Sequence, residues 1–168
     1  GNKSADREME QCFMAGPVQA ESLTIRPIEQ GDRPEWGRLW QGYIQFYKST
    51  LADEMYDIAF DRLLSGNEGE FRGFLAILGD RPVGLVHFLF HRHGWKVEPV
   101  CYLQDLYADP DVRGQGIGAA LITAVYAAAD EAGAPTVYWM TQEGNSQARK
   151  LYDQIAEPTD FIKYQRAS

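Results

Sequence analysis

The glycine-rich stretch from residue 102 to 120 constrains the fold of this chain more than any other feature. It contains three glycines at alternate positions, Gly114, Gly116 and Gly118. Before them lies an apolar run of strand length, which Asp109-Pro110-Asp111 ends with turn-forming residues. After them, apolar residues recur at the spacing of one helical face: Ile117, Leu121, Ala124, Val125 and Ala128. The stretch therefore predicts a strand, a tight loop and an amphipathic helix.

A helix that begins at these glycines offers a site for an anion. The first backbone N–H groups of a helix have no internal partner and lie at the positive end of its dipole. Glycine has no Cβ, so a ligand can approach the backbone closely. Arg113 adds a full positive charge beside the loop. We therefore expect a phosphate or pyrophosphate here, although the glycines alone would equally fit a tight turn that binds nothing.

One interpretation of the loop is a dinucleotide site. Residues 114–119 match the fingerprint G-x-G-x-x-A. That fingerprint normally follows its strand directly, whereas here residues 109–113 intervene. Too few strand and helix alternations follow to build a doubly wound sheet. A nicotinamide-binding oxidoreductase is therefore the weaker interpretation.

A second motif lies downstream of the loop. Asn145, Ala148 and Tyr152 are spaced i, i+3 and i+7, so they share one face of a predicted short helix. Asn145 stands at its start, where its side chain can cap the helix. A tyrosine at such a position could simply be packed with its hydroxyl satisfied, but its occurrence after the glycine loop favours a functional role.

The two motifs together resemble a known family. Residues 113–118 resemble the Q/R-x-x-G-x-G/A loop of the GNAT superfamily of acetyl-CoA-dependent N-acetyltransferases. Residues 137–141, followed by Asn145-x-x-Ala148-x-x-Leu151-Tyr152, look like the next strand and helix of that family. The details are most similar to the branch of histone, polyamine and other small-amine acetyltransferases. The resemblance covers residues 23–164 and is strongest in the second half.

The resemblance implies the fold and the place of the co-substrate. It implies an α/β domain with a mixed, mainly antiparallel central sheet and helices on both faces. The pyrophosphate of acetyl-CoA would lie on backbone N–H groups of the loop, and its pantetheine arm would run along the preceding strand where that strand splays from its neighbour. The implied acetyl-CoA-binding residues are Leu106, Tyr107, Ala108, Arg113, Gly114, Gln115, Gly116, Ile117, Gly118, Ala119, Asn145 and Ala148.

The resemblance also implies direct acetyl transfer to a primary amine in a ternary complex. Tyr152 would protonate the departing thiolate, and a backbone N–H near Leu106 would polarise the thioester carbonyl. Some family members carry Glu where this chain has Gln104, and an amide cannot act as a base. Three proton acceptors remain open: Asp105, Glu143, or a water chain held by Gln104.

The first half of the chain begins with a polar stretch over residues 1–22, which we expect to be a flexible tail, and one domain is expected over residues 23–168. Alternation in Leu23–Pro27 predicts a strand. The run Asp32-Arg33-Pro34-Glu35 is typical of a capping box at the start of a helix. On that helix four aromatic residues form a stripe: Trp36, Trp40, Tyr43 and Tyr47. The stripe indicates core packing, or, for Tyr43 and Tyr47, a wall of the acceptor pocket that attracts an alkylammonium group.

Periodicity and turn residues predict the remaining elements. We expect a helix over residues 53–64, a hairpin of strands over 74–78 and 83–90, a strand over 136–141 and a last strand over 161–165. His87, His91 and His93 cluster at the end of the hairpin. Alternate histidines can bind a metal, but no Cys or nearby Glu completes a ligand set. We therefore expect surface or loop-closing roles for them, and no metal.

Charge and composition restrict the partners. The formal net charge is −8, which argues against nucleic acid and suits a cationic acceptor. No apolar run reaches the roughly 18 residues that a membrane span needs, and no signal pattern opens the chain. Cys12 and Cys101 are far apart, which implies neither a disulfide framework nor a metal site and favours the cytoplasm. The apolar run 161–164 could pair across two chains, so we expect a homodimer.

The acceptor and the function class stay open at this level. A polyamine, another small amine, an amino acid and an amine of a protein or peptide are all compatible with the motifs. A non-catalytic acetyl-CoA-binding or sensing module would keep the glycine loop but would need no general acid. The presence of Tyr152 therefore favours the enzyme.

Overall fold

The computed structural model describes residues 21–168. Nearly all of the predicted tail, together with Cys12, lies outside the described residues. No helix between residues 21 and 168 is both long enough and apolar enough to cross a membrane. In chain order the elements are β1 (Leu23–Pro27), η1 (Gln30–Asp32), α1 (Arg33–Phe46), α2 (Asp53–Ser65), β2 (Arg72–Leu78), β3 (Arg81–His91), β4 (Val100–Ala108), η2 (Pro110–Val112), α3 (Ile117–Glu131), β5 (Val137–Tyr138) and α4 (Ser146–Ile155).

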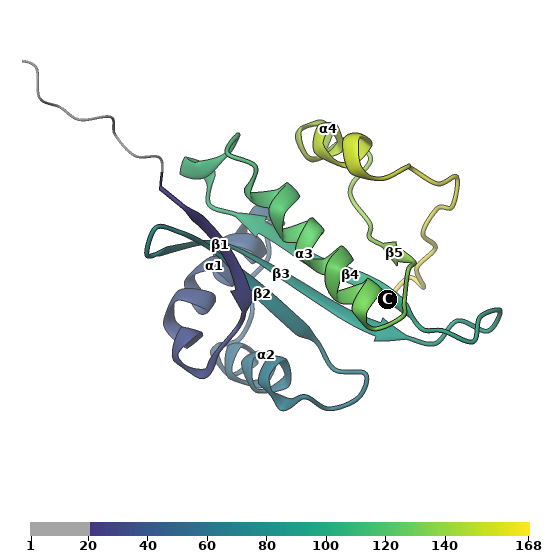
Figure 1. Cartoon of the computed structure of the whole chain (residues 1–168), viewed down its shortest axis with the longest axis horizontal. Coiled ribbons are helices and arrows are strands. Elements are labelled where there is room, and N and C mark those ends of the chain that lie inside the picture. The colour runs from purple at the N-terminus through teal and green to yellow at the C-terminus, as the bar shows by residue number, and fades with distance from the viewer. Residues whose placement is uncertain (1–20) are drawn as a thin grey trace, which may run out of the picture.

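The strands form one sheet in the order β1-β2-β3-β4-β5 (Figure 1). Strands β1 to β4 pair antiparallel with their neighbours, and β5 pairs parallel with β4. A parallel neighbour requires a crossover connection, which α3 supplies here. The predicted mixed, mainly antiparallel sheet is confirmed.

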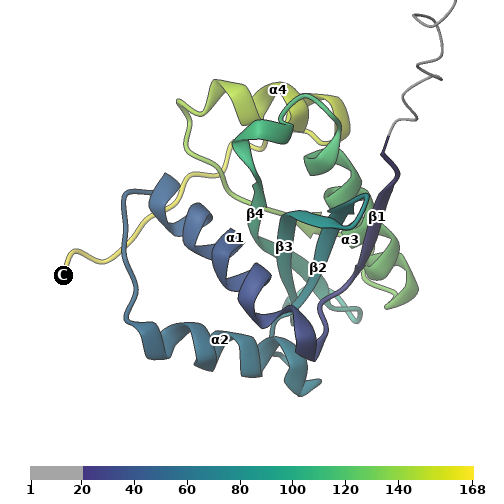
Figure 2. The ribbon, with the colours of Figure 1, turned by 90° about the vertical axis from the view of Figure 1, so that its left-hand side faces the viewer.

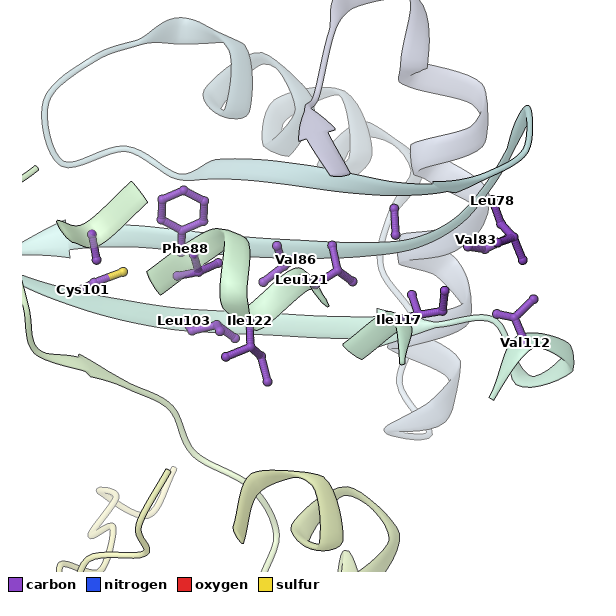
Figure 3. Packing of buried hydrophobic residues seen from close by; sticks show 13 residues of the cluster. Leu78, Val83, Val86, Phe88, Cys101, Leu103, Val112, Ile117, Leu121 and Ile122 are labelled. Carbon is purple, nitrogen blue, oxygen red and sulfur yellow. The ribbon is translucent and has the colours of Figure 1, made fainter. Parts of the chain in front are cut away.

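Helices cover both faces of the sheet, as the sequence predicted. Helix α3 lies on one face, and α1 and α2 lie on the other (Figure 2). Figure 3 shows Phe88 of β3 and Leu103 of β4 facing Leu121 and Ile122 of α3. Burial of each such side chain contributes about 1.5–3 kcal/mol to stability. The second core, on the α1 face, contains Ile28, Trp36, Leu39, Trp40, Phe60, Leu75 and Leu85.

A β-bulge in β4 decides which face its side chains reach. Asp105 is opposite His87 on β3 and Leu103 is opposite the next β3 residue, so Gln104 has no partner in the register. One extra residue shifts the alternation of side chains by one position. Leu103 therefore packs in the α3 core, while Asp105 joins His87 on the α1 side of the sheet.

The predicted capping box at the start of α1 is wrong. Asp32 precedes α1, but its side chain makes no capping bond to this helix. Instead Asp32 Oδ2 accepts a 2.7 Å bond from the backbone N–H of Glu29, and its two oxygens bind Arg26 at 2.7 and 2.9 Å. Glu35 pairs with Arg38 at 3.0 Å. The acidic side chains at this corner therefore bind Arg26 of β1 and Arg38 of α1 and do not cap α1.

Two predicted strands differ in the structure. The strand expected over residues 136–141 is reduced to Val137–Tyr138, because β4 and β5 diverge directly before the bulge at Gln104. The strand expected over 161–165 is absent, and this segment has no regular structure. Its apolar side chains are exposed, because no strand of the described chain pairs with it: Phe161 88%, Ile162 74% and Tyr164 89%.

Candidate active site

The glycine loop joins β4 to α3 and has a backbone that requires glycine. Gly114 and Gly116 have φ of 80° and 78°, in the left-handed region. A Cβ at either position would meet nothing within 4 Å, so backbone conformation rather than crowding selects glycine there. Gly116 precedes the first residue of α3 and supplies no side-chain cap. The loop therefore leaves open space over the first N–H groups of the helix, which suits a phosphate.

Two ion pairs fasten this loop to the rest of the domain. Arg38 of α1 binds both oxygens of Asp109 at 3.1 and 3.2 Å and donates a 2.9 Å bond to the carbonyl of Pro82. Arg81 of β3 binds Asp111 at 3.0 Å. The carboxylate of Asp109 is 13% exposed and that of Asp111 is 63% exposed, so the pair with Arg38 is the one that offsets a partly desolvated charge near the loop. Arg113 is exposed beside the glycines.

The edge of β4 that faces β5 is unpaired over most of its length. The two strands pair only at Cys101 with Val137 and at Tyr102 with Tyr138. From Leu103 to Ala108 the backbone groups on this edge have no strand partner in β5. The predicted splay of the strand at Leu106–Ala108 is therefore present, and it provides backbone donors and acceptors for an extended ligand.

Helix α4 places the second motif beside this edge. The Asn145 Oδ1 accepts the backbone N–H of Ala148 at 3.4 Å, so the predicted cap is confirmed. The Tyr152 ring lies edge-on to Trp139 with ring centroids 5.4 Å apart. Burial, and secondarily Tyr47, raises the pKa of Tyr152 to about 12. Its hydroxyl is therefore protonated at neutral pH and can donate a proton.

An aromatic-lined cavity of about 30 Å³ connects these elements. It brings together five of the residues that the sequence singled out, Tyr43, Tyr47, Gln104, Leu106 and Tyr152, whereas Asp105, Asn145, Ala148 and the glycine loop do not line it. The lining residues are Tyr43, Tyr47, Leu103, Gln104, Leu106, Trp139, Met140 and Tyr152.

The aromatic stripe of α1 has two parts. Trp36 and Trp40 are buried, 0% and 8% exposed, as the core interpretation predicted. Tyr43 and Tyr47 lie one and two turns further along and line the cavity. The same helix therefore anchors the domain at one end and supplies a wall of the cavity at the other.

Asp105 is bound by aromatic N–H groups on the α1 side of the sheet. His87 Nδ1 lies 2.8 Å from Asp105 Oδ2. Trp40 Nε1 donates to the same oxygen at 3.3 Å. The other side of the imidazole is also occupied, because Trp36 Nε1 donates to His87 Nε2 at 2.9 Å. Asp105 therefore has a fixed orientation beside the cavity-lining helix.

The expectation that His87 has a surface or loop-closing role is wrong. His87 is 3% exposed and lies in the middle of a buried strand. A polar side chain within a continuous apolar strand run needs a buried hydrogen-bond partner, and this signal could have identified it. His91 binds the Tyr138 hydroxyl at 2.7 Å. Within residues 21–168, no group of three potential metal ligands comes together.

Asp105 also acts on the phenols around it. Burial, followed by the charge of Asp105, raises the pKa of Tyr43 far above its ordinary value. The pKa of Tyr47 is raised by the same two causes in the same order. Burial raises the pKa of Tyr102, with smaller contributions from Tyr138 and Asp105. These phenols are therefore protonated at neutral pH and lie around a carboxylate.

The structure changes the interpretation of two residues, Glu143 and Thr141. Glu143 is exposed and does not line the cavity, so the structure does not bring it to Tyr152. Thr141, which the sequence did not single out, follows the lining residue Met140. Within residues 21–168, its Oγ1 is the one buried side-chain N or O atom without a hydrogen-bond partner. Such an atom is expected to gain a partner from a ligand or water.

Comparison with known proteins gives one family. The acetyltransferase (GNAT) family matches residues 36–156. The chain is 37% identical over 147 residues to the D-amino-acid N-acetyltransferase of Saccharomyces cerevisiae, covering 86% of this chain and 90% of the yeast protein. It is 29% identical over 83 residues to the thialysine N-epsilon-acetyltransferase of Caenorhabditis elegans, covering 49% of this chain and 51% of that protein.

Solved structures share the fold at low sequence identity. The aminoglycoside acetyltransferase AAC(6')-Iy, in complex with a CoA bisubstrate analogue, has a TM-score of 0.76 at 18% identity and covers 88% of this chain and 99% of its own. The ribosomal-protein-alanine N-acetyltransferase of Brucella melitensis has a TM-score of 0.70 at 24% identity, with coverage of 88% and 100%.

Proposed function

This chain belongs to the acetyltransferase (GNAT) family, and we propose that it transfers the acetyl group of acetyl-CoA directly to a small primary amine in a ternary complex. The observation that supports this proposal is a cavity beside the unpaired edge of β4. It is lined by Tyr152 of α4, by Tyr43 of α1 and by Tyr47, which directly follows α1. A proton donor, a backbone edge and an aromatic wall suited to an ammonium group are the parts that such a transfer needs.

The residues present fit acetyl-CoA. The loop from Arg113 to Ala119 offers helix N–H groups under open space at Gly114 and Gly116. The unpaired edge from Leu106 to Ala108 would hold the pantetheine arm by backbone hydrogen bonds. The orphaned Thr141 hydroxyl lies next to the cavity lining and offers a further hydrogen bond. Bound acetyl-CoA supplies an acetyl group activated as a thioester.

Tyr152 is the proposed general acid. Its phenol is protonated throughout the physiological range, since its pKa is raised to about 12. It lines the cavity together with Leu106, whose neighbouring backbone N–H would polarise the carbonyl oxygen. The backbone N–H would therefore stabilise the carbonyl oxygen as it gains charge, and Tyr152 would stabilise the sulfur as the C–S bond breaks.

The acceptor that we favour is an amino acid or another small amine. The relative with 37% identity over most of both chains is named for D-amino acids, and the nematode relative for a lysine analogue. The small aromatic cavity and the net charge of −8 also favour a compact cation. Polyamines and the amines of peptides are the alternatives that the assay below compares.

The assay combines binding with turnover. Thermal stabilisation is measured with acetyl-CoA, CoA and NAD, and thiol release from acetyl-CoA is then followed with D- and L-amino acids, spermidine and a lysine-rich peptide. A ligand at a hundredfold excess over its dissociation constant stabilises by about 2.7 kcal/mol. We expect stabilisation by acetyl-CoA and CoA, and thiol release with one class of amine. Stabilisation without release on any amine would favour a sensing module, and a response to NAD alone would contradict the assignment of the loop.

We further propose a cytoplasmic homodimer whose catalytic domain spans residues 23–168. Exposed apolar residues of the C-terminal segment, Phe161, Ile162 and Tyr164, support association, although the segment is not a strand in the single chain. Cys101 is a free buried thiol, which is compatible with a reducing compartment. Sedimentation of the protein and of a Phe161→Ser, Ile162→Ser variant tests the dimer, since the variant should sediment as a monomer.

A further inference from the structure

The hydrogen bonds that reach Asp105 have a defined direction. An indole N–H can only donate, so His87 Nε2, which faces Trp36 Nε1 at 2.9 Å, must accept. The proton of a neutral imidazole is therefore on Nδ1, where it is donated to Asp105 Oδ2 at 2.8 Å. Protonation of Nε2 would place two donors against each other. A neutral His87 therefore donates to Asp105 and accepts from Trp36.

Asp105 is a largely buried carboxylate with no cationic partner. Its side chain is 13% exposed, and among residues 21–168 no Lys or Arg lies within 4.0 Å of it. A desolvated carboxylate without a counter-ion is unfavourable, so the position favours a ligand that brings a positive charge or a proton. The titratable groups that face it are His87 of β3, Tyr43 and Tyr47 of α1 and Tyr102 of β4.

We propose, resting on the function proposed above, that Asp105 accepts the proton of the acceptor's ammonium group and that His87 is the positioning residue that aims its carboxylate. Three proton acceptors were compatible with the sequence. Neither Glu143 nor Asp105 is a lining residue, but Glu143 is exposed, whereas Asp105 is 13% exposed and follows the lining residue Gln104 on β4. Gln104 lines the cavity, but its amide cannot accept the proton itself. Trp40, which donates to Asp105, lies one helical turn before the lining residue Tyr43, so Asp105 lies beside the α1 wall of the cavity.

The protons and bonds of the transfer balance with these groups. An ammonium N–H bond breaks, and its proton moves to Asp105. The freed nitrogen lone pair forms the new C–N bond as the C–S bond breaks, and Tyr152 gives its hydroxyl proton to the departing sulfur. The Tyr152 phenolate then takes the second proton that the nitrogen loses, and Asp105 releases the first to water. One proton leaves per turnover, as conversion of an ammonium and a thioester to an amide and a thiol requires.

In water an alkylammonium and an aspartate differ by about 6 pKa units, in the direction that opposes the transfer. The transfer converts two charged groups into two neutral groups, and a site with little water disfavours charged forms in general. Attack of the freed amine on the thioester then removes it from this equilibrium.

The first test replaces the carboxylate without changing its shape. In Asp105→Asn, kcat/KM for thiol release with the amine panel above is expected to fall by about 100-fold at pH 7. The loss should become much smaller toward pH 10, where a large fraction of the acceptor is already a free amine. Tyr152, with a pKa of about 12, remains protonated over this range, so the recovery reports on the acceptor. A structural role for Asp105 predicts a loss that does not depend on pH.

A matched pair of variants separates positioning by His87 from simple packing. The amide of His87→Asn occupies the place of Nδ1 and can still donate to Asp105, whereas the longer His87→Gln reaches the place of Nε2 and bonds Trp36 instead. We expect His87→Asn to retain kcat within about threefold and His87→Gln to lose at least about tenfold, because misplacing a reacting group slows catalysis. Melting temperatures of both variants, with and without acetyl-CoA, show that each is folded.

The outcomes distinguish this inference from the proposed function. If the wild-type protein neither binds acetyl-CoA nor releases thiol, the proposed function fails, and the inference fails with it. If the wild-type protein is active and Asp105→Asn keeps its rate at pH 7, or loses the same factor at every pH, only the inference is overturned. Equal losses in the two His87 variants would overturn the positioning role.

Discussion

Arg38 of α1 binds both carboxylate oxygens of Asp109, at 3.1 and 3.2 Å, and so joins the helix that lines the acceptor cavity to the loop proposed for the pyrophosphate. The side chain of Asp109 is only 13% exposed. Without its arginine, this carboxylate would stand uncompensated next to the anion site. The pair therefore shapes the loop and also offsets a charge that would repel acetyl-CoA.

We predict that Arg38→Met weakens acetyl-CoA binding by about tenfold, which corresponds to about 1.4 kcal/mol. Isothermal titration of the variant with acetyl-CoA measures this loss. Adding Asp109→Asn should restore part of the affinity, since it removes the uncompensated charge. Arg81→Met is the matched control, because its pair with Asp111 is 50% and 63% exposed and such pairs contribute little. Equal effects of the two arginine substitutions would contradict the role given to Arg38.

Replacement of Gly116 is expected to destabilise the protein, and the only cause is the backbone conformation of this residue. Its φ of 78° is unfavourable for any residue with a Cβ, while the space around it is open. Gly116→Ala should therefore lower the free energy of unfolding by about 1–2 kcal/mol. Denaturant titration measures this value. Gly31 also has open space but no positive φ, so Gly31→Ala should change stability by less than about 0.5 kcal/mol.

Tyr152→Phe should separate chemistry from binding. The variant keeps the ring that packs against Trp139 but loses the proton donor, so kcat is expected to fall by about 100-fold while acetyl-CoA still stabilises the protein. Tyr126→Phe is the control. Its hydroxyl donates a 3.0 Å bond to the carbonyl of Ile155, away from the cavity lining. That change should lower stability by about 1 kcal/mol and leave kcat unchanged.

The pH dependence of Tyr152 follows from its raised pKa. An acid must be protonated to act, and a pKa of about 12 keeps Tyr152 protonated until far above neutral pH. We therefore expect no loss of kcat between pH 7 and 10 from this group. A fall of kcat near pH 10 in the wild-type protein that is absent from Tyr152→Phe would show that the phenol titrates at its ordinary value.

Cys101 should be unreactive in the folded protein. Burial is the main cause that raises the pKa of its thiol to about 11, so at pH 8 only about one thiol in a thousand is ionised. In a Cys12→Ser protein, iodoacetamide should therefore label Cys101 only after unfolding in guanidinium chloride. Rapid labelling of the native protein would show that the strand pairing around Cys101 opens.

Some of the site could be predicted from sequence because its signals are local. Alternating glycines before a helical pattern determine a tight loop by the backbone preferences of those residues themselves. The spacing of Asn145, Ala148 and Tyr152 likewise determines a capped helix with three residues on one face. The hydrophobic periodicities of β1 to β4 and α1 to α3 indicate the faces that must be buried, whereas the layered architecture was implied by the family resemblance.

Other features of the site could not be predicted from the sequence, because they depend on contacts between residues far apart in it. Periodicity in the second strand of the hairpin could not reveal that His87 bonds Trp36, 51 positions earlier. The bulge at Gln104 turns Asp105 to the α1 face, and the alternation of residues in the sequence does not reveal this bulge. The predicted strand over 136–141 was too long because β-propensity reports how well side chains fit a pleated surface, whereas pairing depends on a neighbouring strand, and β4 diverges from this segment.

The sequence by itself therefore determined the glycine loop, the helix that follows it and the capped helix with Tyr152, since each arises from interactions between residues a few positions apart. Only the tertiary structure decided which side chains surround the cavity, how Asp105 is aimed and where β4 and β5 separate. Those features depend on how the four α-helices and five strands of residues 21–168 pack against one another, and such packing involves residues far apart in the sequence.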